Sequence, residues 1–69
     1  MNSSQKQLAN LIKDRRKELR IKQEELSEIT SVALRTIRDL EKGIGNPSIQ
    51  TIEKIMDVLG IELDFRLKK

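Results

Sequence analysis

Hydrophobic residues recur at helical spacing along most of the chain, and near its end they alternate with polar ones. A first helix is predicted over about 5–19, with an apolar face formed by Leu8, Leu11, Ile12 and Leu19. Arg15 interrupts this face. Its aliphatic stem can still pack in the core, while its charged head reaches solvent or phosphate.

Two short helices with a brief turn between them follow. The first is predicted over about 23–29, with Leu26 and Ile29 facing inward, and the second over about 33–42. Residues predicted to face inward around the second are Val32, Ile37 and Leu40, and those left outside are Leu34, Arg35, Arg38 and Asp39. This spacing predicts that the two helices cross steeply and that the second one is left half exposed.

A loop over 43–47 precedes a fourth predicted helix. Gly43 stands where a left-handed helix end is expected, and Ser48 can cap the next helix. The stripe of this helix is Ile49, Ile52, Ile55, Met56 and Leu59. Gly60 ends it.

The spacing then changes to a period of two, which predicts a half-buried β-strand. Its apolar side consists of Ile61, Leu63, Phe65 and Leu67. Either this strand lies on the helices as an extended tail, or it pairs with a second copy of the chain. Antiparallel pairing of two copies places opposite charges across from each other, for example Glu62 and Arg66, and we therefore expect a dimer.

Composition narrows the function classes. The 69 residues form one domain of marginal stability, for which dimerisation is a common remedy. No Cys or His is present, so we expect no disulfide, metal or cofactor, and a cytoplasmic location fits. No apolar run is long enough for a membrane span. The lack of His, Cys and Tyr argues against an enzyme.

The basic residues are concentrated near the amino terminus. Residues 1–22 carry seven basic and two acidic side chains, whereas residues 23–43 carry three basic and five acidic ones. A basic segment indicates either an anionic partner such as phosphate or a merely solvated helix face. The half-exposed helix with Arg35 and Arg38 has the shape and charge to enter the major groove of DNA.

The sequence from about 8 to 59 resembles the lambda-repressor-like, or Xre-type, helix-turn-helix family. The positions that carry the resemblance are Gln23, Leu26, Val32, Thr36, Ile37, Glu41, Gly43, Pro47, Ile52, Ile55 and Leu59. The resemblance implies an all-α fold of four to five helices, here followed by the C-terminal β-strand. Residues 1–60 would form the DNA-binding domain and residues 61–69 the dimerisation strand.

The resemblance also implies roles for individual residues. The implied DNA-contacting residues are Lys22, Gln23, Leu34, Arg35, Thr36, Arg38, Lys42 and Asn46. Arg35 and Arg38 are expected to read guanine, with phosphate contact as the alternative for both and pairing with a neighbouring acid as a further alternative for Arg38. Leu34 either contacts a thymine methyl or is simply exposed. Arg16 and Glu41 match a structural ion pair.

Three positions depart from the family pattern. Ser31 stands where the turn usually has Gly, at a cost of roughly 1 kcal/mol if its backbone is left-handed. Ala33 replaces a frequent Ser or Thr cap, so Thr30 or Ser31 is expected to cap instead. Arg15 replaces an apolar core residue.

The tail resembles that of the HipB-type antitoxins. This likeness implies a homodimeric repressor that binds a palindromic operator in its own promoter and also binds a HipA-like kinase toxin. One alternative is a stand-alone or phage-type repressor without a toxin. Another is a protein-interaction module without specific DNA binding, which the acidic middle third and Leu34 would suit.

Overall fold

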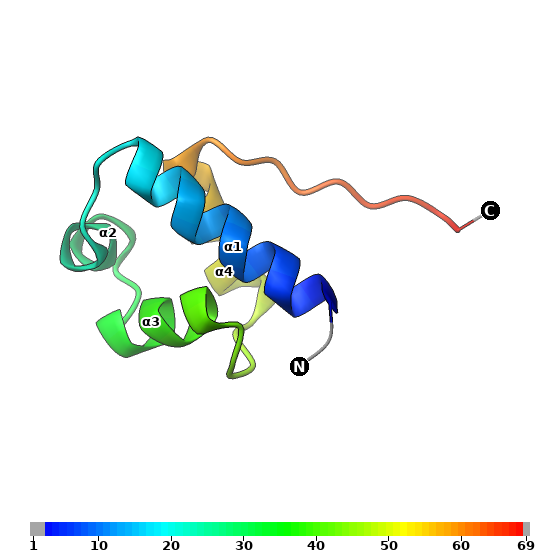
Figure 1. The fold of residues 1–69 in the computed structure, drawn as a ribbon, viewed down its shortest axis with the longest axis horizontal. Helices are drawn as coiled ribbons and strands as arrows, with labels where there is room; N and C mark the ends of the chain where they lie inside the picture. Colours follow the sequence, from blue (N-terminus) through cyan, green and yellow to red (C-terminus); the bar gives the residue numbers. More distant parts are fainter. Residues whose placement is uncertain (1–2, 69) are drawn as a thin grey trace.

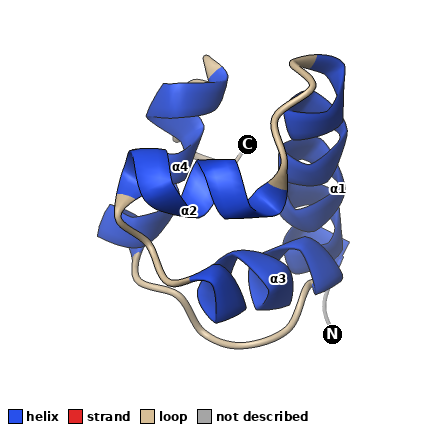
Figure 2. Cartoon of the chain, turned by 90° about the vertical axis from the view of Figure 1, so that its left-hand side faces the viewer, coloured by secondary structure: helices blue, strands red, loops and turns tan. Residues whose placement is uncertain are grey.

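A computed structural model describes residues 3–68, which form four helices and an extended tail. The helices are α1 (Ser3–Glu18), α2 (Gln23–Thr30), α3 (Leu34–Lys42) and α4 (Ile49–Leu59). Helix α1 packs on α3 and α4, and α2 packs on the same two helices. Figure 2 shows α1 and α4 on either side, with α2 spanning the space between them and α3 below it.

The core lies where the four helices meet. Its fully buried side chains come from every helix and are Ile12, Leu26, Ile37, Ile55 and Leu59. Gly43 and Gly60 end α3 and α4 in the left-handed conformation, and their N–H groups donate to carbonyls of the last helical turn. Ser48 caps α4, because its hydroxyl accepts a hydrogen bond from the Thr51 N–H at 3.1 Å. These three predicted helix ends are confirmed.

Four residues that the pattern placed inside are exposed: Leu11, Leu19, Ile29 and Ile49. Each helix buries a narrower face than its apolar residues cover. In α2 the buried pair is Leu26 and Thr30, one turn apart, so Ile29 points away from it. Leu19 lies beyond the end of α1, and Ile49 is the first residue of α4.

The predicted C-terminal β-strand is wrong: within residues 3–68 the structure contains helices and no strand. Residues 61–68 leave α4 as an extended tail that runs away from the helices (Figure 1). Only Ile61 packs against the core, whereas Phe65 and Leu67 are 76% and 96% exposed. A strand needs a neighbouring extended backbone to bond with, and residues 3–68 provide none. The start of the tail, residues 61–63, instead borders a hollow that it shares with α4. The last residue of the predicted strand, 69, lies outside the described residues.

Candidate nucleic-acid interface

The outer face of α3 carries a stripe of positive charge. Arg35, Arg38 and Lys42 are spaced three and four residues apart, which places them on one side of the helix, and all three are exposed. Leu34 lies one turn before Arg38 and is half-buried. The opposite side of α3 is held in the core by Ile37 and Leu40. The helix therefore presents a cationic surface on a fixed base.

The turn between α2 and α3 is held by side-chain hydrogen bonds. Ser31 has φ 60° and ψ 21°, a left-handed conformation that costs a residue other than glycine roughly 1 kcal/mol. The Thr30 hydroxyl donates to the Leu26 carbonyl at 2.7 Å and accepts from the Val32 N–H at 3.2 Å. The Ser27 hydroxyl donates to the Val32 carbonyl at 2.6 Å. These bonds fix the angle between the two helices.

The start of α3 has no such support. Ala33 occupies the N-cap position, and no side chain of the described residues caps this end. The expectation that Thr30 or Ser31 caps α3 is wrong, because the Thr30 hydroxyl is engaged within the turn. The first amides of α3 are therefore left for solvent or a ligand.

Buried Glu41 ties α3 to α1 and α2. The Arg16 guanidinium donates to both of its carboxylate oxygens, at 2.6 Å from Nε and 2.9 Å from the second nitrogen. The remaining guanidinium nitrogen donates to the Ile21 carbonyl at 2.8 Å. Gln23 also donates to Glu41, with 3.1 Å between Nε2 and Oε1. Two other helices, α1 through Arg16 and α2 through Gln23, thus converge on one carboxylate of the helix that carries the basic stripe.

The bond between the Arg16 and Glu41 side chains affects the ionisation of Arg16. The hydrogen bond from Arg16 to Glu41 raises the pKa of Arg16 above its ordinary value, against the opposing effect of burial. Arg16 and Glu41 are only 9% and 6% exposed. Removal of either partner would leave a buried charge without compensation.

A hollow of about 160 Å³ separates α3 from the loop that follows it. Thr36 and Asp39 line it from the helix, and Asn46 lines it from the loop. Gly45, with φ +83°, approaches α3 closely: an added Cβ would lie 3.6 Å from the Asp39 Cβ. Asp39, which is not among the predicted site residues, is half-buried beside the basic stripe. Its position could not be inferred from spacing, because it depends on the path of the loop.

The start of α2 contributes the remaining predicted contacts. Lys22 is exposed immediately before the helix, and its backbone N–H donates to the Glu25 carboxylate at 3.1 Å. Gln23 is half-buried because it reaches Glu41. The structure therefore arranges the predicted residues in three groups: the start of α2, the outer side of α3, and the loop that includes exposed Asn46.

Two of the amino-terminal arginines are used inside the fold. Arg15 donates from Nε to the Leu59 carbonyl at 2.8 Å and approaches Glu18 at 3.4 Å. Its head thus caps the end of α4, and 39% of the side chain stays exposed to solvent. With Arg16 paired to Glu41, part of the basic character of this segment is structural. No helix in residues 3–68 is both long and apolar enough to cross a membrane.

This arrangement, two short helices at a fixed angle with the second one exposed, defines a helix-turn-helix domain. Residues 12–66 match the helix-turn-helix family, and the chain belongs to it. An uncharacterized HTH-type transcriptional regulator of Methanothermobacter thermautotrophicus is 44% identical over 55 residues, which cover 80% of each chain. The ImmF control region 10 kDa protein of Bacillus phage phi105 is 34% identical over 59 residues, covering 86% of this chain and 66% of the phage protein.

Proposed function

We propose that this protein is a sequence-specific, DNA-binding transcriptional repressor that inserts α3 into the major groove. The observation that carries the proposal is the exposed stripe of Arg35, Arg38 and Lys42 on a helix whose inner side is fixed by Glu41. A major groove admits one α-helix, and an arginine on its outer side can donate two hydrogen bonds to guanine. Membership of a family with transcriptional regulators among its relatives supports the same function.

Each group of residues has a distinct role in this proposal. Arg35 and Arg38 read bases, and Leu34 contacts a thymine methyl next to them. Phosphates are bound by Thr36 and Lys42 on the reading helix itself, and on its two sides by Lys22 and Gln23 at the start of α2 and by Asn46 in the loop. Gln23 is well suited to this role because its contact with Glu41 orients the amide.

We further propose that the protein acts as a homodimer on a palindromic operator, in the cytoplasm. Two copies would place their α3 helices about one DNA turn apart. The segment from 61 onward is the candidate dimerisation segment, because Leu63, Phe65 and Leu67 expose apolar side chains that a second copy would cover. A domain of this size also gains stability from association.

A repressor without a toxin partner is the form of the proposal that we favour. The relative from phage phi105 is named for a control region, and neither relative is named as an antitoxin. The narrower hypothesis, a HipB-type antitoxin that binds a kinase toxin, depended on the tail strand. A neighbouring gene for a kinase-like protein, and co-purification of its product, would revive that hypothesis.

The decisive experiment is a titration of the protein against the duplex upstream of its own gene and against a scrambled duplex, over a salt series. We expect tight binding to the first only, with two chains per site and an affinity that falls steeply with salt. Equal, weak binding to both duplexes would mean that the protein binds DNA through charge alone, without sequence specificity. If an Arg35→Ala/Arg38→Ala double variant bound the upstream duplex undiminished, the reading role of α3 would be refuted and a protein-interaction module favoured.

A further inference from the structure

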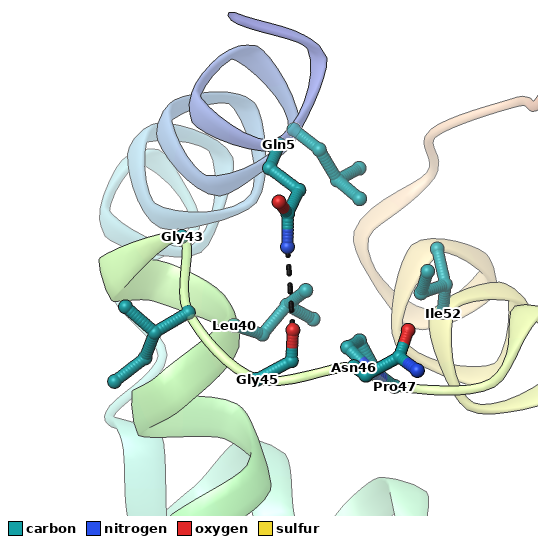
Figure 3. A pocket seen from close by; sticks show the side chains of 9 residues that line it. Gln5, Leu40, Gly43, Gly45, Asn46, Pro47 and Ile52 are labelled. Atoms are coloured by element: carbon teal, nitrogen blue, oxygen red, sulfur yellow. Dashed lines mark hydrogen bonds between the residues drawn. The ribbon is translucent and has the colours of Figure 1, made fainter. Parts of the chain in front are cut away.

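A second hollow, larger than the one beside Asp39, lies on the other side of the 43–47 loop. It has a volume of about 430 Å³ and is bounded by the start of α1, the end of α3, the loop and α4 (Figure 3). It is lined by Gln5 and Leu8 of α1, Leu40 of α3, Ile52 of α4 and the five loop residues 43–47. A volume of this size falls within the range of pockets that hold small molecules.

The chemistry of the lining selects the kind of molecule. None of these nine residues is charged, although 36% of the residues of the chain are. Leu8, Leu40 and Ile52 supply apolar surface from three helices. Polar contacts are limited to uncharged groups, among them the Gln5 amide, which donates to the Gly45 carbonyl at 3.3 Å (Figure 3). A charged ligand would lose its hydration here without gaining an ion pair.

We propose that this pocket binds a small, uncharged, mainly apolar molecule that carries one hydrogen-bond donor. The donor would bond to the Gly45 carbonyl in place of the Gln5 amide, and the apolar part would lie against Leu8 and Ile52. The contact between Gln5 and Gly45 is exposed, so its replacement requires no opening of the core.

The pocket shares its loop with the candidate DNA interface. Ile44, Gly45, Asn46 and Pro47 line both this pocket and the hollow beside Asp39, so the loop forms a thin wall between them. Gly43 and Gly45 have positive φ values of 76° and 83°. A ligand that displaces this wall moves Asn46, and the affinity for DNA changes with it. This second step rests on the proposed function; the binding itself does not.

The binding is tested without DNA, by following the backbone amide resonances of the ¹⁵N-labelled protein. The probes are indole and cyclohexanol, each uncharged with one donor, and benzoate as the charged comparison. We expect saturable shifts at the lining residues with the first two and none with benzoate. Absence of saturable shifts with both uncharged probes, or equal shifts with benzoate, would overturn the proposal.

A matched pair of variants locates the site. Ile44 and Ile49 are 49% and 51% exposed, but only Ile44 lines the pocket. Ile44→Trp should obstruct the pocket and weaken indole binding at least tenfold, whereas Ile49→Trp should leave it unchanged. Because Ile44 also lines the smaller hollow, the indole-induced shifts must in addition fall on Leu8 and Ile52, which line only the larger one. Equal loss in both variants, or in neither, would place the bound indole elsewhere and refute the assignment.

The regulatory step has its own measurement. Saturating indole should change the affinity of the protein for its upstream duplex several-fold, and this change should be absent in Ile44→Trp. Binding of indole with no change in DNA affinity would refute the regulatory step and leave the ligand site standing. If the protein bound no specific duplex, the proposed function would fail, while the amide-shift experiment would still decide the ligand site.

Discussion

Two groups of arginines in this chain have the same chemistry and opposite surroundings. Arg15 and Arg16 lie near the end of α1. Arg15 donates to the Leu59 carbonyl, and Arg16 donates to the Ile21 carbonyl and the Glu41 carboxylate. Arg35 and Arg38, on α3, are exposed. The first group holds helices together, and the second is available to a partner. Charge counted along a sequence does not separate these uses, because burial and bonding partners decide between them.

The largest expected effect comes from breaking the buried pair. Arg16→Met leaves the Glu41 carboxylate buried without its partner and should lower the free energy of unfolding by about 3–5 kcal/mol. Urea unfolding followed by circular dichroism measures this loss. In the double variant Arg16→Met/Glu41→Leu, most of the stability should return, since the uncompensated charge is gone. A double variant as unstable as the single one would contradict this account.

The matching change in the exposed group should act on binding instead. Arg35→Ala should weaken affinity for the operator roughly 5- to 150-fold, which corresponds to about 1–3 kcal/mol for a bidentate contact with a base. Its free energy of unfolding should change by less than about 0.5 kcal/mol. The control is Lys54→Ala, an exposed lysine on α4 outside the candidate interface. If both variants weakened binding equally, Arg35 would contribute only general charge.

Arg15 provides a milder test of the structural group. Arg15→Met keeps the stem but removes the hydrogen bond to the Leu59 carbonyl. We expect a loss of about 1.5 kcal/mol in the free energy of unfolding, the lower end for a bond from a charged donor, because the site is partly exposed. Lys17→Met, at an exposed position of the same helix, should stay within about 0.5 kcal/mol. Comparable losses in the two variants would argue against the role given to Arg15.

The smallest expected effect concerns the turn that sets the angle of the exposed arginines. Ser31 adopts a left-handed conformation, which glycine reaches without strain. Ser31→Gly should therefore raise the free energy of unfolding by up to about 1 kcal/mol. Glu28→Gly, within α2, should lower it by about the same amount, since glycine is unfavourable inside a helix. Thermal unfolding of both variants measures these changes, and a lower melting temperature for Ser31→Gly than for the unaltered protein would contradict the prediction.

The sequence predicts the helices well because helical periodicity is a local signal. It fails where a residue's surroundings depend on packing: Ile29 has the right spacing for the core, yet α2 buries the side with Thr30 instead. The tail fails for a related reason. Alternation of Leu63, Phe65 and Leu67 indicates two faces, but a strand also needs a bonding neighbour that residues 3–68 do not provide.

In the candidate site, too, local spacing predicts some features, whereas others depend on how the helices pack. The resemblance to the helix-turn-helix family indicated which residues to consider, and the exposed positions on α3 follow from helical spacing. The contact of Gln23 with Glu41 joins two helices across 18 positions, whereas helical spacing predicts only contacts within one helix. The apolar pocket beneath the loop is a gap between three packed helices, and the sequence carries no direct sign of it.

The convergence of Arg16 and Gln23 on Glu41 has a thermodynamic consequence. Because α3 is already fixed to α1 and α2 before any partner arrives, little of the domain has to fold when it docks. Association should therefore show only the modest negative heat-capacity change of the surface that is buried, without the large additional term of coupled folding. Calorimetric titrations of the operator at several temperatures would give this heat-capacity change as the slope of the binding enthalpy against temperature. A small value would mean that α3 enters the groove as a rigid body.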